Sequence, residues 1–373
     1  MFRPSLRSNW SLVGLAILSL IVYYFAQTTH KDIKMRWYED KMEAAKTMQK
    51  YLKVLKAEAI SKGYNIDKTN DPNETGLIGK SVTSITTSRG LLSQKLTSLN
   101  PNLAAVFIEY LKKMNLDKGD YVAVGFTGAN PGANLALYAA LETMELNPVI
   151  IVSLGSAGFG ANRLDFTWLD MEAVLYQEGL INFQSHYASL GGSNDNGRGL
   201  SKEGRNSLIA AIKRNNCTLI NYGSLTKNID LRMDYYQDEL PESSSYQAFI
   251  NLGGAKANVG EFINAKLIKD GINRNLADFN FDRKGCIAYF AMDNIPILHA
   301  FYITKIADRY GLPIDPEPLP KPGTGKVFIN KVNNVTVAAI GLGLILLAVT
   351  LVILFDRKDR HFTRNIVDPD KSI

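Results

Sequence analysis

The sequence contains few of the side chains that metal and redox sites require. Its two cysteines, Cys217 and Cys286, are too far apart in the chain for a CxxC redox motif or a zinc ribbon. The four histidines form no HxxxH or HExxH pattern. We therefore expect no metal site and no cofactor. We expect two buried, unreactive thiols, with one disulfide as the alternative for an extracytoplasmic domain.

The chain also lacks a basic patch of the kind that binds nucleic acid. Its formal net charge is +6, but residues 1–60 contain ten Lys and Arg against five Asp and Glu, and residues 321–373 contain eight against four. Residues 61–320 contain 24 basic and 27 acidic side chains. The central part is therefore slightly acidic, which predicts no nucleic-acid partner, and the basic surplus lies near the two ends.

Charge is absent from two long apolar runs, residues 12–26 and 335–355. The second is long enough to cross a bilayer as a helix. The first is extended by Trp10, Tyr23 and Tyr24, which suit the headgroup boundary. No small-x-small cleavage site follows it, so we interpret it as an uncleaved anchor rather than a signal peptide. The chain is thus expected to be attached to a membrane near both ends.

Basic residues beside the two runs indicate the orientation. Arg3 and Arg7 precede the first run, and the second run is followed by Arg357, Lys358, Arg360, Arg364 and Lys371. They favour two cytoplasmic termini and an extracytoplasmic central domain, although Lys31, Lys34 and Arg36 favour the opposite orientation. We expect the first arrangement.

The pattern divides the chain into seven segments. They are a cytoplasmic tail at 1–9, a transmembrane helix at 10–27, an amphipathic helical stalk at 28–62, an α/β domain at 63–311, a proline-rich linker at 312–332, a second transmembrane helix at 333–355 and a cytoplasmic tail at 356–373. Apolar residues recur in the stalk at steps of three and four. This apolar stripe either packs on its own domain or docks a helix of a partner.

Short apolar runs alternate with helical patterns in the central domain. The runs at 121–126 and 148–154 flank an amphipathic helix at 133–146, which predicts a βαβ unit with parallel strands. Further strands are expected at 217–222, 247–252 and 286–291, and further helices at 202–215, 225–240 and 299–310. The fold class is therefore α/β, with a Rossmann-like, mostly parallel sheet and flanking helices, plus one transmembrane helix at each end.

Glycine-rich turns at 125–132, 155–160 and 253–260 follow three of the apolar runs. Ligands of parallel sheets bind beyond the carboxyl ends of the strands, so these turns predict an anion or ligand pocket. The candidate residues are Thr127, Gly128, Asn130, Ser153, Ser156, Gly253, Gly254 and Asn258. None of the turns matches GxGxxG or a P-loop, and the alternative is that the glycines only permit tight turns.

Two further segments have both a structural and a functional interpretation. Residues 165–172 begin a helix capped by Asp165 or Thr167, or else present Asp170 and Glu172 as a carboxylate pair. Residues 191–199 form a flexible polar loop, in which Arg198 could bind a carboxylate with both arms of its guanidinium. Arg89 and Lys95 offer the same chemistry.

A serine nucleophile is an alternative interpretation of the second glycine-rich turn. Residues 154–158 resemble a G-x-S-x-G elbow, but Leu154 replaces the first glycine. His186 or His299 would then supply the base, although His299 closes an apolar run and is better interpreted as a core histidine.

Several segments together resemble the family of poly-γ-glutamate system proteins. They are RPSLRSNWS at 3–11, NDPNETGLIG at 70–79, NPN at 100–102, FTWLDME at 166–172 and GRGLS at 197–201. The resemblance implies a membrane-anchored accessory component of poly-γ-glutamate (capsule or secreted polymer) synthesis or export. Its partners would be the poly-γ-glutamate synthase membrane complex and the anionic polymer, but no catalytic residue transfers. The alternative is an enzyme, either a hydrolase or transferase acting on the polymer or a sugar-phosphate isomerase-like domain that uses the glycine-rich turns.

Overall fold

The computed structural model describes residues 8–276 and 278–364, which belong to two compact units. The first, here the helical-pair unit, combines the segments Met1–Lys34 and Ile329–Ile373. The second, here the α/β unit, is Met35–Phe328. Arg3, Arg7 and Lys371, which contributed to the expected orientation, lie outside the described residues.

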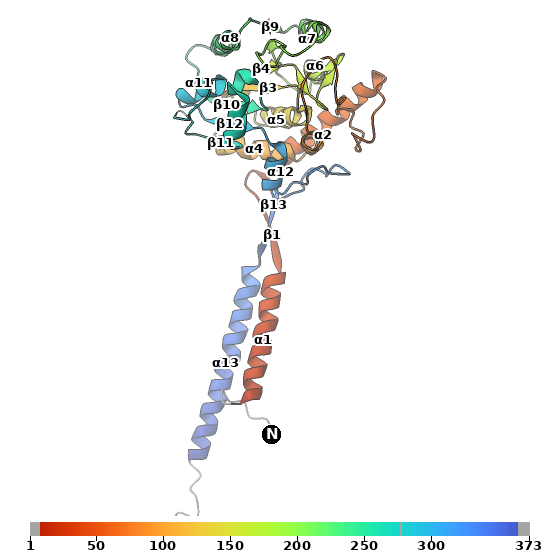
Figure 1. The fold of residues 1–373 in the computed structure, drawn as a ribbon. Helices are drawn as coiled ribbons and strands as arrows, with labels where there is room; N and C mark the ends of the chain where they lie inside the picture. The colour runs from red at the N-terminus through yellow and green to blue at the C-terminus, as the bar shows by residue number, and fades with distance from the viewer. Residues whose placement is uncertain (1–7, 277, 365–373) are drawn as a thin grey trace, which may run out of the picture. The chain divides into compact units, whose positions relative to one another are not determined.

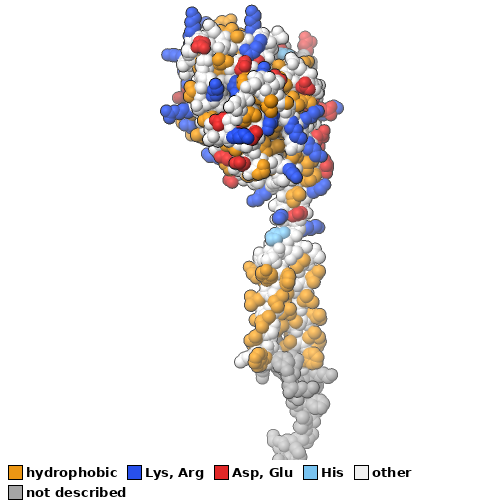
Figure 2. Space-filling model, turned by 90° about the vertical axis from the view of Figure 1, so that its right-hand side faces the viewer, with side chains coloured by type: hydrophobic (Ala, Val, Ile, Leu, Met, Phe, Trp, Pro, Cys, Tyr) orange, Lys and Arg blue, Asp and Glu red, His pale blue; other side chains and the backbone are white. Residues whose placement is uncertain are grey.

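The helical-pair unit contains two apolar helices, α1 (Asn9–Thr28) and α13 (Val335–Arg364), that lie side by side (Figure 1). Both are long and apolar enough to cross a membrane, with mean hydropathies of 1.7 and 2.9 over their apolar parts. A Cβ at Gly341 would lie 2.3 Å from a methyl carbon of Val22, so glycine permits the close approach. Strands β1 (His30–Lys34) and β13 (Ile329–Asn333) form an antiparallel pair. Figure 2 shows hydrophobic side chains over the visible face of the paired helices, whereas charged side chains gather on the α/β unit.

A seven-stranded, mostly parallel sheet forms the centre of the α/β unit (Figure 1). Its strands are β3 (Tyr121–Thr127), β4 (Asn147–Ser153), β8 (Tyr187–Ser189), β9 (Thr218–Ile220), β10 (Tyr246–Leu252), β11 (Gly271–Asn273) and β12 (Ile297–Ala300). Their order is β11-β12-β10-β3-β4-β8-β9, and β11 alone runs antiparallel to its neighbour. The predicted α/β class with a mostly parallel sheet is therefore confirmed.

Helices surround this sheet. They are α2 (Tyr38–Ser61), α3 (Leu92–Ser98), α4 (Leu103–Lys113), α5 (Pro131–Thr143), α6 (Trp168–Gln177), α7 (Lys202–Arg214), α8 (Leu225–Asp238), α9 (Lys256–Val259), α10 (Phe262–Leu267), α11 (Cys286–Met292) and α12 (Ile303–Arg309). The α/β unit also contains two separate two-stranded sheets. Strands β2 (Thr86–Ser88) and β5 (Ser156–Ala157) are parallel, and strands β6 (Asn162–Arg163) and β7 (Phe166–Thr167) are antiparallel.

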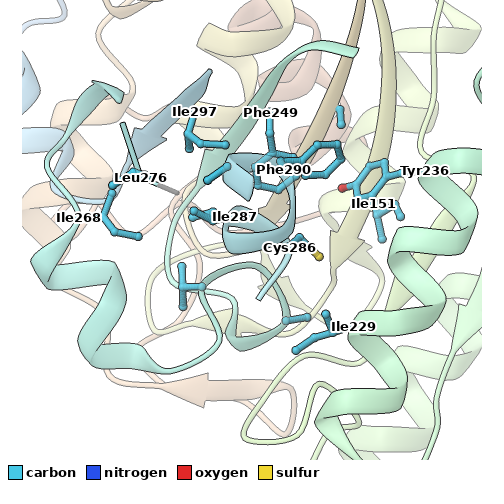
Figure 3. Packing of buried hydrophobic residues seen from close by; sticks show 14 of the residues in the cluster. Ile151, Ile229, Tyr236, Phe249, Ile268, Leu276, Cys286, Ile287, Phe290 and Ile297 are labelled. Carbon is cyan, nitrogen blue, oxygen red and sulfur yellow. The ribbon is translucent and has the colours of Figure 1, made fainter. Parts of the chain in front are cut away.

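The sheet buries apolar side chains on both faces, as parallel sheets do. On one face Phe126 of β3 makes edge contacts with Tyr138 of α5 and Trp168 of α6. On the other face Phe249 of β10 stacks on Phe290 of α11, 4.6 Å between ring centres, and Tyr236 of α8 lies beside them (Figure 3). Two separate cores therefore hold the strands in place.

Helix α2 packs against α4, α5 and α6, and its apolar stripe is buried. This arrangement favours the packing interpretation of the stripe over the docking of a partner helix. Lys41 of α2 is fully buried, forms an ion pair with Glu109 of α4, and donates to the Val327 carbonyl (3.0 Å). The proline-rich segment expected to be a linker is likewise attached, because Asn73 and Asn102 donate to carbonyl oxygens within it.

Three of the secondary-structure predictions are wrong. The stalk predicted to be helical over 28–62 begins with strand β1, and its helix, α2, starts only at Tyr38. Residues 286–291, predicted as a strand, form helix α11, and the expected helix at 299–310 begins with strand β12. Helix α11 contributes four residues to the hydrophobic core: Cys286, Ile287, Phe290 and Ala291. Their spacing of three and four residues is helical, but a short apolar run does not reveal it, because every residue in the run is apolar.

Cys217 and Cys286 are free thiols, and burial raises the pKa of each to about 12.

Candidate ligand-binding site

A cavity of about 510 Å³ lies at the carboxyl ends of the central parallel strands. Segments that follow β3, β4, β8 and β10 line it, together with α3, the segment before α3 and the segment between β12 and α12. The chain builds the sheet outward from β3 through β4 and β8 to β9, and then returns to place β10 on the other side of β3. The cavity therefore lies at the point where the strand order reverses, the usual ligand site of open α/β sheets.

The structure brings the three glycine-rich turns together at this cavity. The first turn contributes Thr127 and Asn130 to the lining. The second contributes Gly155, and Ser153 lines the cavity just before that turn. The third contributes Gly253 and Gly254. Five of the predicted site residues thus line one cavity: Thr127, Asn130, Ser153, Gly253 and Gly254. Their gathering follows from strand topology, as expected from the sequence.

The other predicted site residues lie outside the cavity lining. The Ser156 hydroxyl is buried and donates to backbone carbonyls, including that of Gly128 (3.0 Å). A Cβ at Gly128 would lie 2.8 Å from the Leu154 carbonyl oxygen, so glycine is needed there for close packing. Ser156 is therefore held as a structural bridge between two turns, which does not suit the nucleophile of a serine hydrolase.

Asp170 and Glu172 serve different structural roles. Asp170 forms a capping box with Thr167 at the start of α6 and a bidentate ion pair with Arg214. Burial raises the pKa of Asp170, but the hydrogen bonds from Arg214 and its neighbours outweigh this effect and leave it below the usual range. Glu172 is buried against Tyr138 and Ser185, and burial raises its pKa. The capping interpretation, with Thr167 as the cap, is confirmed.

The loop at 191–199 contributes a buried acid rather than an exposed arginine. Arg198 is exposed and lies outside the cavity lining, whereas Asp195 is 1 % exposed and lines it. Arg232 of α8 donates to Asp195 Oδ2 from Nε (3.1 Å) and Nη2 (2.8 Å). Ser153 and Ser189 donate to Asp195 Oδ1 at 2.8 and 2.7 Å. This cluster joins the ends of β4 and β8 to α8 directly beneath the cavity.

The polar cluster continues under the third turn through Asn258, the remaining predicted residue. Arg232 Nη1 donates to Asn258 Oδ1 (3.4 Å), and Asn258 donates to Asn251 (2.9 Å). Asn251 donates to His299 Nδ1 (3.0 Å), and His299 Nε2 donates to the Ala265 carbonyl (3.0 Å). Burial lowers the pKa of His299, so the ring is neutral, and the core-histidine interpretation is confirmed.

Lys95 is the most unusual group in the cavity lining. It lies in the last turn of α3, is 5 % exposed, and donates to Asn130 Oδ1 (2.7 Å). Burial lowers the pKa of this ammonium to about 7. Since no acidic partner among the described residues compensates for that burial, an incoming anion would be the natural counter-charge.

The cavity lining is cationic overall. Arg89, Lys95, Lys256 and Lys266 line it, while Asp195 is the one carboxylate among the described lining residues and is neutralised by Arg232. Lys256 forms an ion pair with Glu261 (2.8 Å). Arg89 and Lys266 are exposed at the rim, so a negative ligand meets charge at the entrance and at the base.

Sequence reasoning missed Arg232 and Asp195, and it mentioned Lys95 only in passing. A signal for Arg232 exists, because it follows Ile229 by three residues and precedes Tyr236 by four on the apolar face of α8. A charged residue on such a face needs a buried partner. For Asp195 and Lys95 the sequence carries no comparable local signal.

Among the described residues, no group of three or more His, Cys, Asp or Glu side chains is placed to hold a metal ion. The cavity therefore offers ammonium and guanidinium groups, backbone turns and hydroxyls, a donor set that suits carboxylates and phosphates. Comparisons of the chain with protein-family models, with curated proteins and with solved structures found no match.

Proposed function

We propose that the protein is a membrane-anchored accessory component of poly-γ-glutamate synthesis or export, and that its α/β unit binds the carboxylates of the polymer. The observation that carries the binding proposal is the charge of the cavity, where Lys95 is buried and has no acidic partner within the described part of the chain. Carboxylates bound to lysine and arginine form charge-assisted hydrogen bonds, which are among the stronger contacts in proteins. The choice of polymer rests on the resemblance of the sequence segments.

The size of the cavity supports a short stretch of ligand. Ligand pockets commonly measure about 300–1,000 Å³, and this one is about 510 Å³. Such a volume suits a few residues of a polymer or a small molecule, rather than a long chain lying in a groove. We therefore propose local recognition of the polymer, with the sheet regarded as Rossmann-like because its ligand site lies at the reversal of strand order.

Helices α1 and α13 would anchor this unit to the membrane and provide surfaces for the synthase membrane complex. The basic residues outside the two apolar segments support cytoplasmic termini and an extracytoplasmic α/β unit. An exported polymer would then meet the cavity on the outer side of the membrane.

An enzyme acting on the same ligand is the second candidate, and one observation favours it. The lowered pKa of Lys95, about 7, is the value expected of a general base working near neutral pH. Chain cleavage during the binding experiment below would identify this activity.

Calorimetry with the full-length protein in lipid nanodiscs tests the proposed function. We expect γ-linked tetraglutamate to bind and Lys95→Met to weaken the affinity by about 10- to 100-fold, because a hydrogen bond to a charged group is worth about 1.5–3 kcal/mol. The matched control is Lys53→Met, at an exposed position on α2, which should bind as the unaltered protein does. Equal affinities of the Lys95→Met variant and the unaltered protein, or no binding by either, would contradict the proposal.

A further inference from the structure

We propose that the cavity takes the carboxyl end of a poly-γ-glutamate chain and excludes its amino end. This inference rests on the proposed function and names the part of the polymer that Lys95 meets. The juxtaposition that carries it is a buried lysine, Lys95, in the lining of the same cavity as a carboxylate, Asp195, whose hydrogen-bonding positions are already filled.

The two ends of the polymer differ in charge. In a γ-linked chain every residue carries an α-carboxylate, and the last residue carries a γ-carboxylate as well. The first residue instead carries an ammonium group next to its carboxylate. An ammonium has three N–H donors and no acceptor, so a site that encloses it must supply carboxylate or carbonyl oxygens.

The lining residues that the structure describes supply no free carboxylate for an ammonium. A carboxylate has about four lone-pair positions, and Asp195 uses them for two serine hydroxyls and two N–H groups of Arg232. Glu261, which is near the third turn but outside the described lining, forms ion pairs with Lys256 (2.8 Å) and Arg283 (3.2 Å). An amino end placed here would add a positive charge to a cationic cavity.

Donors for a terminal pair of carboxylates are present. Lys95 Nζ has one hydrogen-bond partner among the described residues, Asn130 Oδ1, so the protonated amine has donors left for a ligand. Arg89 and Lys266 lie at the exposed rim of the same cavity. One carboxylate of the terminal residue would reach Lys95 at the base, and the other would meet the rim cations. The low pKa of Lys95 agrees with this arrangement, since an adjacent carboxylate would restore its charge.

The test uses the full-length protein in lipid nanodiscs and four γ-linked tetraglutamates. They are the unmodified peptide, an N-acetylated form, a form with both carboxyl groups of the last residue amidated, and a control with the α-carboxyls of the two internal residues amidated. The last two forms carry the same charge, so a difference between them reports position and not net charge.

We expect N-acetylation to change the dissociation constant less than about threefold, internal amidation to weaken binding modestly, and terminal amidation to weaken it at least tenfold. Lys95→Met should remove the difference between the two amidated forms, whereas Lys53→Met should keep it. Equal binding of the two amidated forms, or stronger loss on N-acetylation, would overturn the inference while leaving carboxylate binding intact. Failure of all four forms to bind would overturn the proposed function as well.

Two further ligands distinguish the sources of negative charge. α-Linked tetraglutamate carries the same charges on a different backbone, and inorganic phosphate carries charge alone. We expect both to compete at least tenfold more weakly than γ-linked tetraglutamate. Competition by phosphate at the same concentration as the oligomer would overturn the inference, because the cavity would then be a site for small inorganic anions.

Discussion

Lys95→Met is expected to raise the free energy of unfolding of the ligand-free protein by about 2 kcal/mol at pH 8. Burial lowers the pKa of Lys95 from 10.5 to about 7. Folding at pH 8 must therefore remove a proton from this amine, which costs roughly 3 kcal/mol. Methionine has a similar shape and avoids that cost, while the lost hydrogen bond to Asn130 offsets about 1 kcal/mol.

The pH dependence gives this expectation a definite sign. The pKa of Lys95 is lower in the folded than in the unfolded protein, so the destabilisation is complete below pH 7 and disappears as the pH rises toward 10.5. The titratable groups on the segments around the cavity and α3 include Arg89, Asp195, Lys256, Lys266, Tyr302, Lys305, Asp308 and Asp315. Burial is nevertheless the cause of the lowered pKa, which makes the effect specific to Lys95.

Urea denaturation of the full-length protein in detergent at several pH values measures this effect. The stability gained by Lys95→Met should shrink between about pH 7 and pH 10, and Lys53→Met should show no such trend. A variant that is less stable than the unaltered protein at every pH would mean that Lys95 is charged and compensated in the folded state. A gain in stability combined with a loss of binding is typical of residues kept for function.

Arg232→Met is expected to lower the free energy of unfolding by about 3–5 kcal/mol, because it leaves a buried carboxylate without its counter-charge. Arg232 is fully buried and Asp195 is 1 % exposed. The change also removes donors from Ser153 and Ser189, which join β4 and β8 to this cluster. Because these residues lie under the cavity, we expect binding to be lost as well.

A second variant separates the charge effect from the loss of packing. Asp195→Asn combined with Arg232→Met removes both charges, and its cost should be clearly smaller than the sum of the two single changes. Lys118→Met breaks an exposed ion pair with Glu145 and should cost about 0–1 kcal/mol, as exposed pairs do. A free energy of unfolding for Arg232→Met within about 1 kcal/mol of that of the unaltered protein would contradict the description of Arg232 and Asp195 as a buried ion pair.

The location of the candidate site could be predicted from the sequence because it follows from topology. Apolar runs ending in glycine-rich turns place Thr127, Ser153 and Gly253 at the same edge of any parallel sheet. A local capping signal was informative too, since Thr167, one of the two residues predicted to cap the helix that begins in 165–172, is the N-cap of α6. Such features depend on residues close together in the chain.

The charges and buried groups of the candidate site could not be predicted in the same way because they depend on burial by distant segments. Lys95 belongs to a short helix whose sequence resembles an exposed one, and α5 and α12 enclose it from elsewhere in the chain. Asp195 lies in a polar, glycine-rich loop typical of flexible surface segments, but its partner Arg232 is 37 residues away. The burial of Lys95 and of Asp195 can be recognised only in the folded structure, where the sheet brings these distant segments together.

Proton uptake on binding tests most directly whether the ligand carboxylate meets Lys95. N-acetylated γ-linked tetraglutamate, which has no amine to titrate, is bound to the full-length protein at pH 8 in two buffers of different ionisation enthalpy. If a carboxylate raises the pKa of Lys95 from about 7, the unaltered protein should take up about 0.5–1 proton per ligand, and Lys95→Met should take up almost none. Binding without proton uptake by the unaltered protein would contradict the account.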